Sequence, residues 1–205
     1  MPMKSYLVAL MLTAVALPAY AQAPAGGAPQ GTPTNIRGKL VKVDGKNLTV
    51  KTREGQTVNV ALTPDAGVRY MKKSKLGDIK QGDYLSILTV PGKDGKQHAL
   101  DIHGLPARAP EMQAPFDYAS GSMMTNAHLQ GVAKVKNGNV LTVTQKGSTS
   151  EVVVDSKTLI DTGVEGTASD LKAGKAVFLR ATKGADGSLS ANNVTVEKNG
   201  VKPVM

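Results

Sequence analysis

Short segments in which apolar and polar residues alternate recur along the chain, and they come in two matching sets. Alternation with a period of two is typical of half-buried β-strands, and it is clearest over residues 48–50 and 141–143, both Leu-Thr-Val. The pairs Asp44-Gly45 and Asn137-Gly138 precede these segments and suit the tight turn of a β-hairpin. The pattern therefore predicts an all-β protein.

The two sets align with each other over most of their length. Residues 37–53 align with residues 130–146 without a gap, and after one deletion Gly55 aligns with Gly147 and Asp78 with Asp170. Glycines and turn residues in register over so long a stretch indicate an internal duplication. We therefore divide the chain into repeat 1, residues 36–105, and repeat 2, residues 129–200.

Each repeat is expected to contain five strands, with a helical turn between the third and the fourth. In repeat 1 the predicted strands are residues 36–43, 47–52, 57–62, 83–90 and 99–103. In repeat 2 they are residues 129–135, 139–144, 150–154, 175–181 and 191–197. The predicted helical turn is at residues 74–82 in repeat 1 and at residues 169–174 in repeat 2. This is the element order of an OB-fold, a five-stranded, partly open barrel. We predict two tandem OB-like barrels, each closing its own hydrophobic interior.

The recurring residues also resemble a bacterial family of exported, OB-like domains of unknown function. The family pattern is a glycine in the first strand, an Asp-Gly or Asn-Gly hairpin, Leu-Thr-Val, and a D-L-K-x-G-D turn. Repeat 1 carries it at Gly38, 44–45, 48–50 and 78–83, and repeat 2 at Gly131, 137–138, 141–143 and 170–175, with Lys175 in place of the last Asp. The resemblance covers both repeats and implies the fold, but no particular function.

The N-terminal segment predicts export. Lys4 precedes an apolar run over residues 6–17, and Ala19 and Ala21 satisfy the small-residue rule for cleavage before Gln22. The run is shorter than the about 20 residues that span a bilayer. We expect residues 1–21 to be a signal peptide and the mature protein to be periplasmic or secreted, without a transmembrane segment.

Two segments outside the repeats differ in composition. Residues 22–35 are rich in Ala, Pro and Gly and are expected to form a flexible tether. Residues 106–128 form a Pro- and Met-containing linker between the repeats. Within and beside the linker, Met112, Met123, Met124 and His128 are a candidate copper site, because thioethers and imidazole suit Cu(I). The alternative is a linker that packs against the barrels, since Met also fills irregular apolar crevices.

The chain contains no cysteine and has a formal net charge of +9, most of it in repeat 1. Disulfides, thiolate nucleophiles and zinc–thiolate sites are therefore excluded. The densest cationic run is Arg69, Lys72, Lys73 and Lys75. It is a candidate for binding an anionic surface, and the alternative is a solvated face without a dedicated partner.

Asp101 and His103 are two residues apart on a predicted strand, so their side chains share a face. Such a pair can bind a divalent ion or transfer protons. The aligned positions in repeat 2 are Asn193 and Thr195, so the pair does not recur, and we expect it to face solvent.

Neither a G-x-S-x-G nor an H-E-x-x-H motif occurs, so catalysis is not expected. Nucleic acid is an unlikely partner, because few aromatic residues are present to stack on bases. We expect an exported, non-enzymatic binding or scaffolding protein of the bacterial envelope, without a cofactor. Its partner would be an envelope protein, an anionic glycan or a lipid surface. The alternative is a periplasmic metal-handling protein that takes copper through the Met- and His-containing linker.

Overall fold

The computed structural model describes residues 31–136 and 138–204. These residues form twelve β-strands and two short 3-10 helices, and the described part of the chain contains no α-helix. The predicted all-β class is confirmed. The predicted signal peptide and residues 22–30 of the predicted tether lie outside the described residues. No helix in the described part is long and apolar enough to cross a bilayer.

The strands follow one another along the chain with short connections. Repeat 1 contributes β1 (Thr32–Asp44), β2 (Asn47–Thr52), β3 (Thr57–Lys73), β4 (Tyr84–Pro91) and β5 (Gln97–Gly104). The rest of the chain contributes β6 (Met112–Pro115), β7 (Met123–Val135), β8 (Gly138–Gln145), β9 (Ser148–Val154), β10 (Leu159–Glu165), β11 (Ala176–Lys183) and β12 (Leu189–Val196). The 3-10 helices η1 (Leu76–Asp78) and η2 (Ala168–Asp170) lie at the two predicted helical turns.

Several boundaries differ from the prediction. β1 begins at Thr32 and pairs there with β11, so residues 32–35 are strand rather than tether. β7 begins at Met123, so the end of the predicted linker, residues 123–128, belongs to a strand. The second half of β3 and the whole of β10 were not predicted, because neither segment keeps a clear alternation of apolar and polar residues.

The two repeats exchange strands. β1, β2 and β3 of repeat 1 close a five-stranded barrel with β11 and β12 of repeat 2, through the β1–β11 and β3–β12 pairs. We call this the first barrel. β7, β8 and β9 of repeat 2 form a second ring with β4 and β5 of repeat 1, and a single register pair, His98 with Val153, joins β5 to β9. The prediction that each repeat closes its own interior is therefore wrong.

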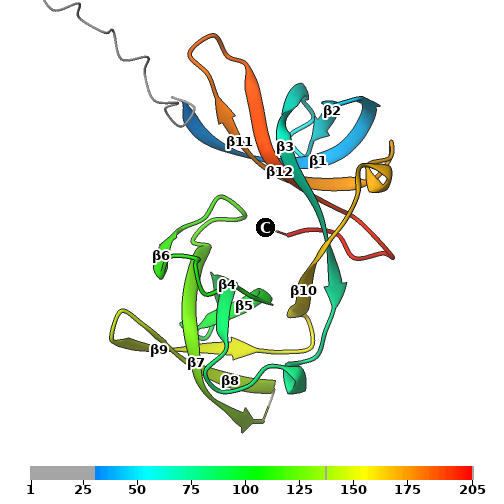
Figure 1. Cartoon of the computed structure of the whole chain (residues 1–205). Helices are drawn as coiled ribbons and strands as arrows, with labels where there is room; N and C mark the ends of the chain where they lie inside the picture. The colour runs from blue at the N-terminus through cyan, green and yellow to red at the C-terminus, as the bar shows by residue number, and fades with distance from the viewer. Residues whose placement is uncertain (1–30, 137, 205) are drawn as a thin grey trace, which may run out of the picture.

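The exchange follows from the course of β3. This strand runs for 17 residues and carries the chain out of the first barrel, so β4 and β5 form beside β7 (Figure 1). Toward its C-terminal end β3 pairs antiparallel with β10, and the pairing is centred on Met71 and Gly163. β10 also pairs in parallel with β5, which makes the sheet continuous from one barrel to the other. Alternation along a strand specifies which face is buried, but not which strand becomes its neighbour.

The exchanged strands enclose separate hydrophobic cores. The core of the first barrel includes the fully or almost fully buried residues Leu40, Leu48, Val50, Val60, Leu179 and Val194. The core of the second ring includes Leu85, Ile87, Ile102, Leu129, Leu141 and Val143. A smaller cluster of Leu88, Met124 and Phe178 joins the two bodies. Each large apolar side chain so buried contributes about 1.5–3 kcal/mol relative to exposure, so the contact between the bodies stabilises the fold.

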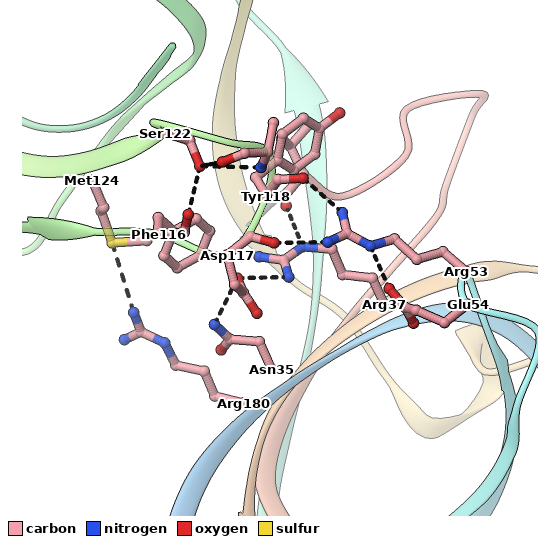
Figure 2. A network of polar contacts seen from close by, with 12 residues as sticks. Asn35, Arg37, Arg53, Glu54, Phe116, Asp117, Tyr118, Ser122, Met124 and Arg180 are labelled. Atoms are coloured by element: carbon pink, nitrogen blue, oxygen red, sulfur yellow. Dashed lines mark hydrogen bonds and ion pairs between the residues drawn. The ribbon is translucent and has the colours of Figure 1, made fainter. Parts of the chain in front are cut away.

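The loop between β6 and β7 is fastened to the first barrel by Arg37 of β1 (Figure 2). The Arg37 side chain is 10% exposed, and its Nη1 lies 2.9 Å from the Asp117 carboxylate. Its guanidinium also lies over the rings of Phe116 and Phe178, at 4.9 and 4.7 Å from their centroids. The buried charge therefore has both an ionic and an aromatic partner on this loop or beside it.

A second arginine holds the same loop. Arg53, just after β2, donates hydrogen bonds to the backbone carbonyls of Asp117 and Tyr118, at 2.7 and 3.0 Å (Figure 2). Asn35 donates a further bond to the Asp117 carboxylate at 3.0 Å. These contacts dock the segment between the repeats onto the first barrel, so it is not a free linker.

Candidate functional site

A row of polar side chains crosses the sheet where the first barrel meets the second ring. The strand register places Asp161 of β10 beside His103 of β5, His103 beside Ser86 of β4, and Ser86 beside Asn126 of β7. Residues directly opposite each other on paired strands project from the same face of the sheet. The row therefore gives one face of the second ring a polar stripe that continues onto β10.

Three members of the row, Ser86, His103 and Asn126, line a cavity of about 500 Å³ between the first barrel and the second ring. We call it the inter-barrel cavity. The first barrel supplies the opposite wall through Phe178, Arg180, Asn193, Thr195 and Arg69, and the segment after β5 supplies Arg108. The charged lining thus consists of three arginines and the titratable His103, without a carboxylate.

The three arginines carry free positive charge. Within the described part of the chain, Arg69, Arg108 and Arg180 form no ion pair, although Glu165 lies across from Arg69 in the β3–β10 pair. Arg180 donates instead to the Met124 thioether at 3.6 Å (Figure 2), and sulfur is a weak acceptor. The cavity therefore has several guanidinium donors available for an anion.

Asn126 offers the cavity a hydrogen-bond acceptor, whereas the arginines offer donors. Its Nδ2 donates to the carbonyl of Pro110 at 3.0 Å. Its Oδ1 is buried and has no hydrogen-bond partner in the described part of the chain. An unpaired buried acceptor is unfavourable by about 1–3 kcal/mol, which a donor on a ligand would relieve.

A compact cluster of Asp101, His103 and Asp161 lies at the end of the polar row. His103 Nδ1 is 3.0 Å from Asp101 Oδ2 and 3.9 Å from Asp161 Oδ1. The side chains are 3%, 16% and 0% exposed in the order Asp101, His103 and Asp161. The prediction that Asp101 and His103 face solvent is therefore wrong, because β10 and the first barrel cover this face of β5.

The electrostatics of the cluster are dominated by Asp161. Burial, and after it the nearby charge of Asp101, raises the pKa of Asp161 to about 7, and the His103 imidazole acts in the opposite direction. Neither carboxylate oxygen of Asp161 has a hydrogen-bond donor in the described part of the chain. Two close carboxylates cannot both ionise without compensation, so the cluster can hold one proton or one cation.

The residues predicted as a copper site do not form one ligand set. Met112 and Met124 line the inter-barrel cavity, but Met123 projects from the opposite face of β7, because neighbouring residues of a strand alternate. His128 stacks on Tyr84, with ring centroids 4.6 Å apart. Four residues separate Met124 from His128, which corresponds to about 13 Å along a strand. One ion cannot reach both.

The predicted cationic run does not form one patch. Arg69, Lys72, Lys73 and Lys75 are all exposed. Arg69 lines the inter-barrel cavity, whereas Lys72 and Lys73 are consecutive in β3 and project from opposite faces. Lys75 follows the strand, at the start of η1. Of the four cations, only Arg69 contributes to the candidate site.

Sequence reasoning did not find Asp161, Arg108 or Arg180. Asp161 lies in an unpredicted strand, and the two arginines reach the cavity only through the strand exchange. The sequence contained one indication for Asp161. In the alignment of the repeats Asp161 is aligned with Arg69, so the same position carries a negative charge in repeat 2 and a positive charge in repeat 1.

Another cavity, of about 600 Å³, lies on the first barrel beside the C-terminal segment. Its two arginines, Arg37 and Arg53, already bind Asp117, Glu54 and backbone carbonyls. The rest of the lining is Lys39, Lys51, Lys202 and Thr52 together with small or apolar residues, and it contains neither a histidine nor an amide side chain. The inter-barrel cavity is therefore the better candidate for a specific site.

Comparison of the chain with models of protein families, with curated proteins and with solved structures gave no match. The resemblance to exported OB-like domains therefore stays a prediction. The function has to be inferred from the chemistry of the site.

Proposed function

We propose that this protein is an exported, non-enzymatic binding or scaffolding protein of the bacterial envelope, and that its inter-barrel cavity binds an acidic glycan. The observation that carries the proposal is that Arg69, Arg108 and Arg180 line one cavity without an ion-pair partner in the described part of the chain. Export itself rests on the N-terminal sequence pattern.

The strand order supports an OB-type reading of both bodies. In each of them the first three strands of one repeat meet the last two strands of the other, and the third strand runs parallel to the fifth, as β3 does to β12 and β9 to β5. OB-folds bind oligosaccharides as well as oligonucleotides, so a glycan is compatible with the fold.

The lining of the cavity favours a sugar acid over the other partners considered. A guanidinium matches a carboxylate or phosphate with two parallel hydrogen bonds, and the amides and hydroxyls of Asn126, Asn193 and Thr195 suit sugar hydroxyl groups. A cavity of about 500 Å³ is within the usual range of small-molecule sites. Phe178 is the only Phe, Tyr or Trp among the described residues that line it, so base stacking has little support.

The other partners fit the geometry less well. A lipid surface requires cations on one exposed face, whereas the cationic run on β3 is divided between two faces. Copper handling through the linker would require Met124 and His128 to share an ion, and they lie too far apart along β7. Both ideas therefore rank below the acidic glycan.

The test is calorimetric titration of the full chain with a short oligogalacturonate, with the neutral galactose oligomer of the same length as the matched ligand. Arg180→Gln and Arg108→Gln remove one guanidinium each from the cavity. Lys134→Gln is the matched control, because Lys134 is exposed on β7 and does not line the cavity. A hydrogen bond to a charged group contributes about 1.5–3 kcal/mol, so each arginine variant should lower the affinity about 10- to 150-fold.

The proposal predicts that the neutral oligomer does not bind and that Lys134→Gln binds as the unmodified chain does. Equal binding of the charged and the neutral oligomer would reject it. So would an affinity for oligogalacturonate that is insensitive to both arginine substitutions.

A further inference from the structure

The least compensated group in the described part of the chain is the carboxylate of Asp161. Its side chain is completely buried, and neither oxygen has a hydrogen-bond partner in that part. Lys73, its neighbour across the β3–β10 pair, does not form an ion pair with it. A buried carboxylate without a partner is strongly unfavourable, and buried charges in proteins are normally paired or bound to a metal ion.

The surroundings of Asp161 provide two further metal-ligating groups. One oxygen each from Asp101 and Asp161 and one ring nitrogen of His103 lie within 4.8 Å of one another. Two ligands of a tetrahedral zinc ion, at about 2.1 Å from the metal, lie about 3.4 Å apart. The two distances from His103 Nδ1 to the carboxylates, 3.0 and 3.9 Å, bracket this spacing.

We propose that Asp101, His103 and Asp161 bind one divalent first-row transition-metal ion, for which Zn²⁺ is the best match. An imidazole nitrogen with two carboxylate oxygens suits zinc and its neighbours, whereas Ca²⁺ and Mg²⁺ require six or more oxygen ligands. Cu(I) prefers sulfur, which this cluster lacks. Three protein ligands leave the fourth position of a tetrahedral site to water or to a ligand.

The cluster lies between two cavities. His103 lines the inter-barrel cavity, and Asp161 lines a separate cavity of about 310 Å³ beside η1 and β4. The pairing of β10 with β5 is short, with three register pairs that end at Asp161 and His103. An ion held between these strands would link a strand of repeat 1 to a strand of repeat 2.

The metal site and the proposed glycan site share only His103, which belongs to the cluster and also lines the inter-barrel cavity. Asp101 and Asp161 do not line the inter-barrel cavity, and the cavity arginines do not belong to the cluster. Loss of metal binding and loss of glycan binding can therefore be produced separately, by Asp161→Asn and by Arg180→Gln.

The chain offers a matched control of the same residue types. His98 lies 3.0 Å from Asp94 and 3.9 Å from Asp155. The two carboxylates approach opposite ring nitrogens, Nε2 and Nδ1, so they cannot share one ion with the imidazole. Both are also well exposed, whereas Asp101 and Asp161 are buried.

The experiment uses the full chain without a histidine tag, treated with EDTA and then freed of it. Calorimetric titration with ZnCl₂ should give one ion per chain and a rise in Tm that EDTA reverses. Asp161→Asn and His103→Gln should each weaken zinc binding at least tenfold, and His98→Gln should leave it unchanged. Each variant is first compared with the unmodified chain by circular dichroism in EDTA.

A second measurement does not depend on variants. The chain contains three histidines, and stoichiometric Zn²⁺ should shift the imidazole NMR signals of His103 while those of His98 and His128 stay in place. The proposal is overturned if no 1:1 binding is detected, or if zinc shifts the signals of His98 or His128 instead. It is equally overturned if folded Asp161→Asn binds zinc as tightly as the unmodified chain.

Discussion

Aligned positions of the two repeats meet at the inter-barrel cavity and carry opposite chemistry. The second ring and β10 contribute Asp101, His103 and Asp161, of which His103 lines the cavity and the two carboxylates lie beside it. The aligned positions in the first barrel and β3 are Asn193, Thr195 and Arg69, and all three line the cavity. The register is the same on both sides: His103 lies beside Asp161 on a parallel strand, and Thr195 lies beside Arg69 on a parallel strand. One side gathers two carboxylates and an imidazole, while the other offers a guanidinium, an amide and a hydroxyl.

The strand exchange explains why these positions face each other. β3 and β10 contain aligned segments, and they pair antiparallel about Met71 and Gly163, which are themselves aligned. This pairing gives the two aligned strand segments an approximate local two-fold relation, and residues from both repeats line the same cavity. The aligned segments differ in a few side chains, and the strand exchange brings both kinds of side chain to one cavity.

The largest expected effect comes from the cores, where the repeats remained alike. Leu48 and Leu141 are aligned and completely buried, one in each core. Leu48→Ala and Leu141→Ala should each lower the free energy of unfolding by about 2–5 kcal/mol. Because each core contains strands of both repeats, either substitution should shift one common unfolding transition, which urea denaturation followed by circular dichroism and by NMR can measure.

The contrary result would restore the prediction of two self-contained repeats. In that case each substitution would split the denaturation curve, and half of the NMR signals would keep the unmodified midpoint. Val41→Ala is a suitable control, because this large apolar side chain is 51% exposed and should change the stability by less than about 0.5 kcal/mol.

A smaller difference separates two aligned glycines, Gly38 in β1 and Gly131 in β7. A Cβ atom at Gly38 would clash with the backbone carbonyl of Lys51, whereas a Cβ atom at Gly131 would meet no atom within 4 Å. Gly38→Ala should therefore destabilise the protein by about 1–3 kcal/mol, and Gly131→Ala by less than about 0.5 kcal/mol. Thermal unfolding of the two variants measures the difference, and equal losses would show that the repeats pack alike at this position.

Much of the strand content was predictable from the sequence, because it is encoded locally. β2 has the predicted bounds, and the tight turn predicted at Asp44-Gly45 joins β1 to β2, with Gly45 at φ 57°. Alternation and turn chemistry act over a few residues, so one sequence is sufficient to find them.

The partners of the strands were not predictable in the same way. Both repeats contain all five strand patterns, so pairing within a repeat and pairing between repeats bury the same residues. The choice depends on the long β3 and on β10, where residues 69–73 pair with residues 161–165. The candidate site was missed for the same reason, because Asp161 and Arg180 approach β5 and β7 only after the exchange.

The smallest predicted effect concerns the loop that only the first barrel holds. Arg37 is aligned with Gln130, so repeat 2 has no equivalent of the Arg37–Asp117 pair. Burial lowers the pKa of Arg37, and the Asp117 carboxylate acts against this by stabilising the charge. Asp117 is 49% exposed, so solvent screens the pair, and Asp117→Asn should lower the free energy of unfolding by about 1 kcal/mol.

Asp44→Asn is the matched control, because the Lys42–Asp44 pair is more exposed on both sides and Asn-Gly fits the same turn. Urea denaturation should rank Asp117→Asn below Asp44→Asn in stability. The reverse order would mean that the stability of the first barrel does not depend on the loop.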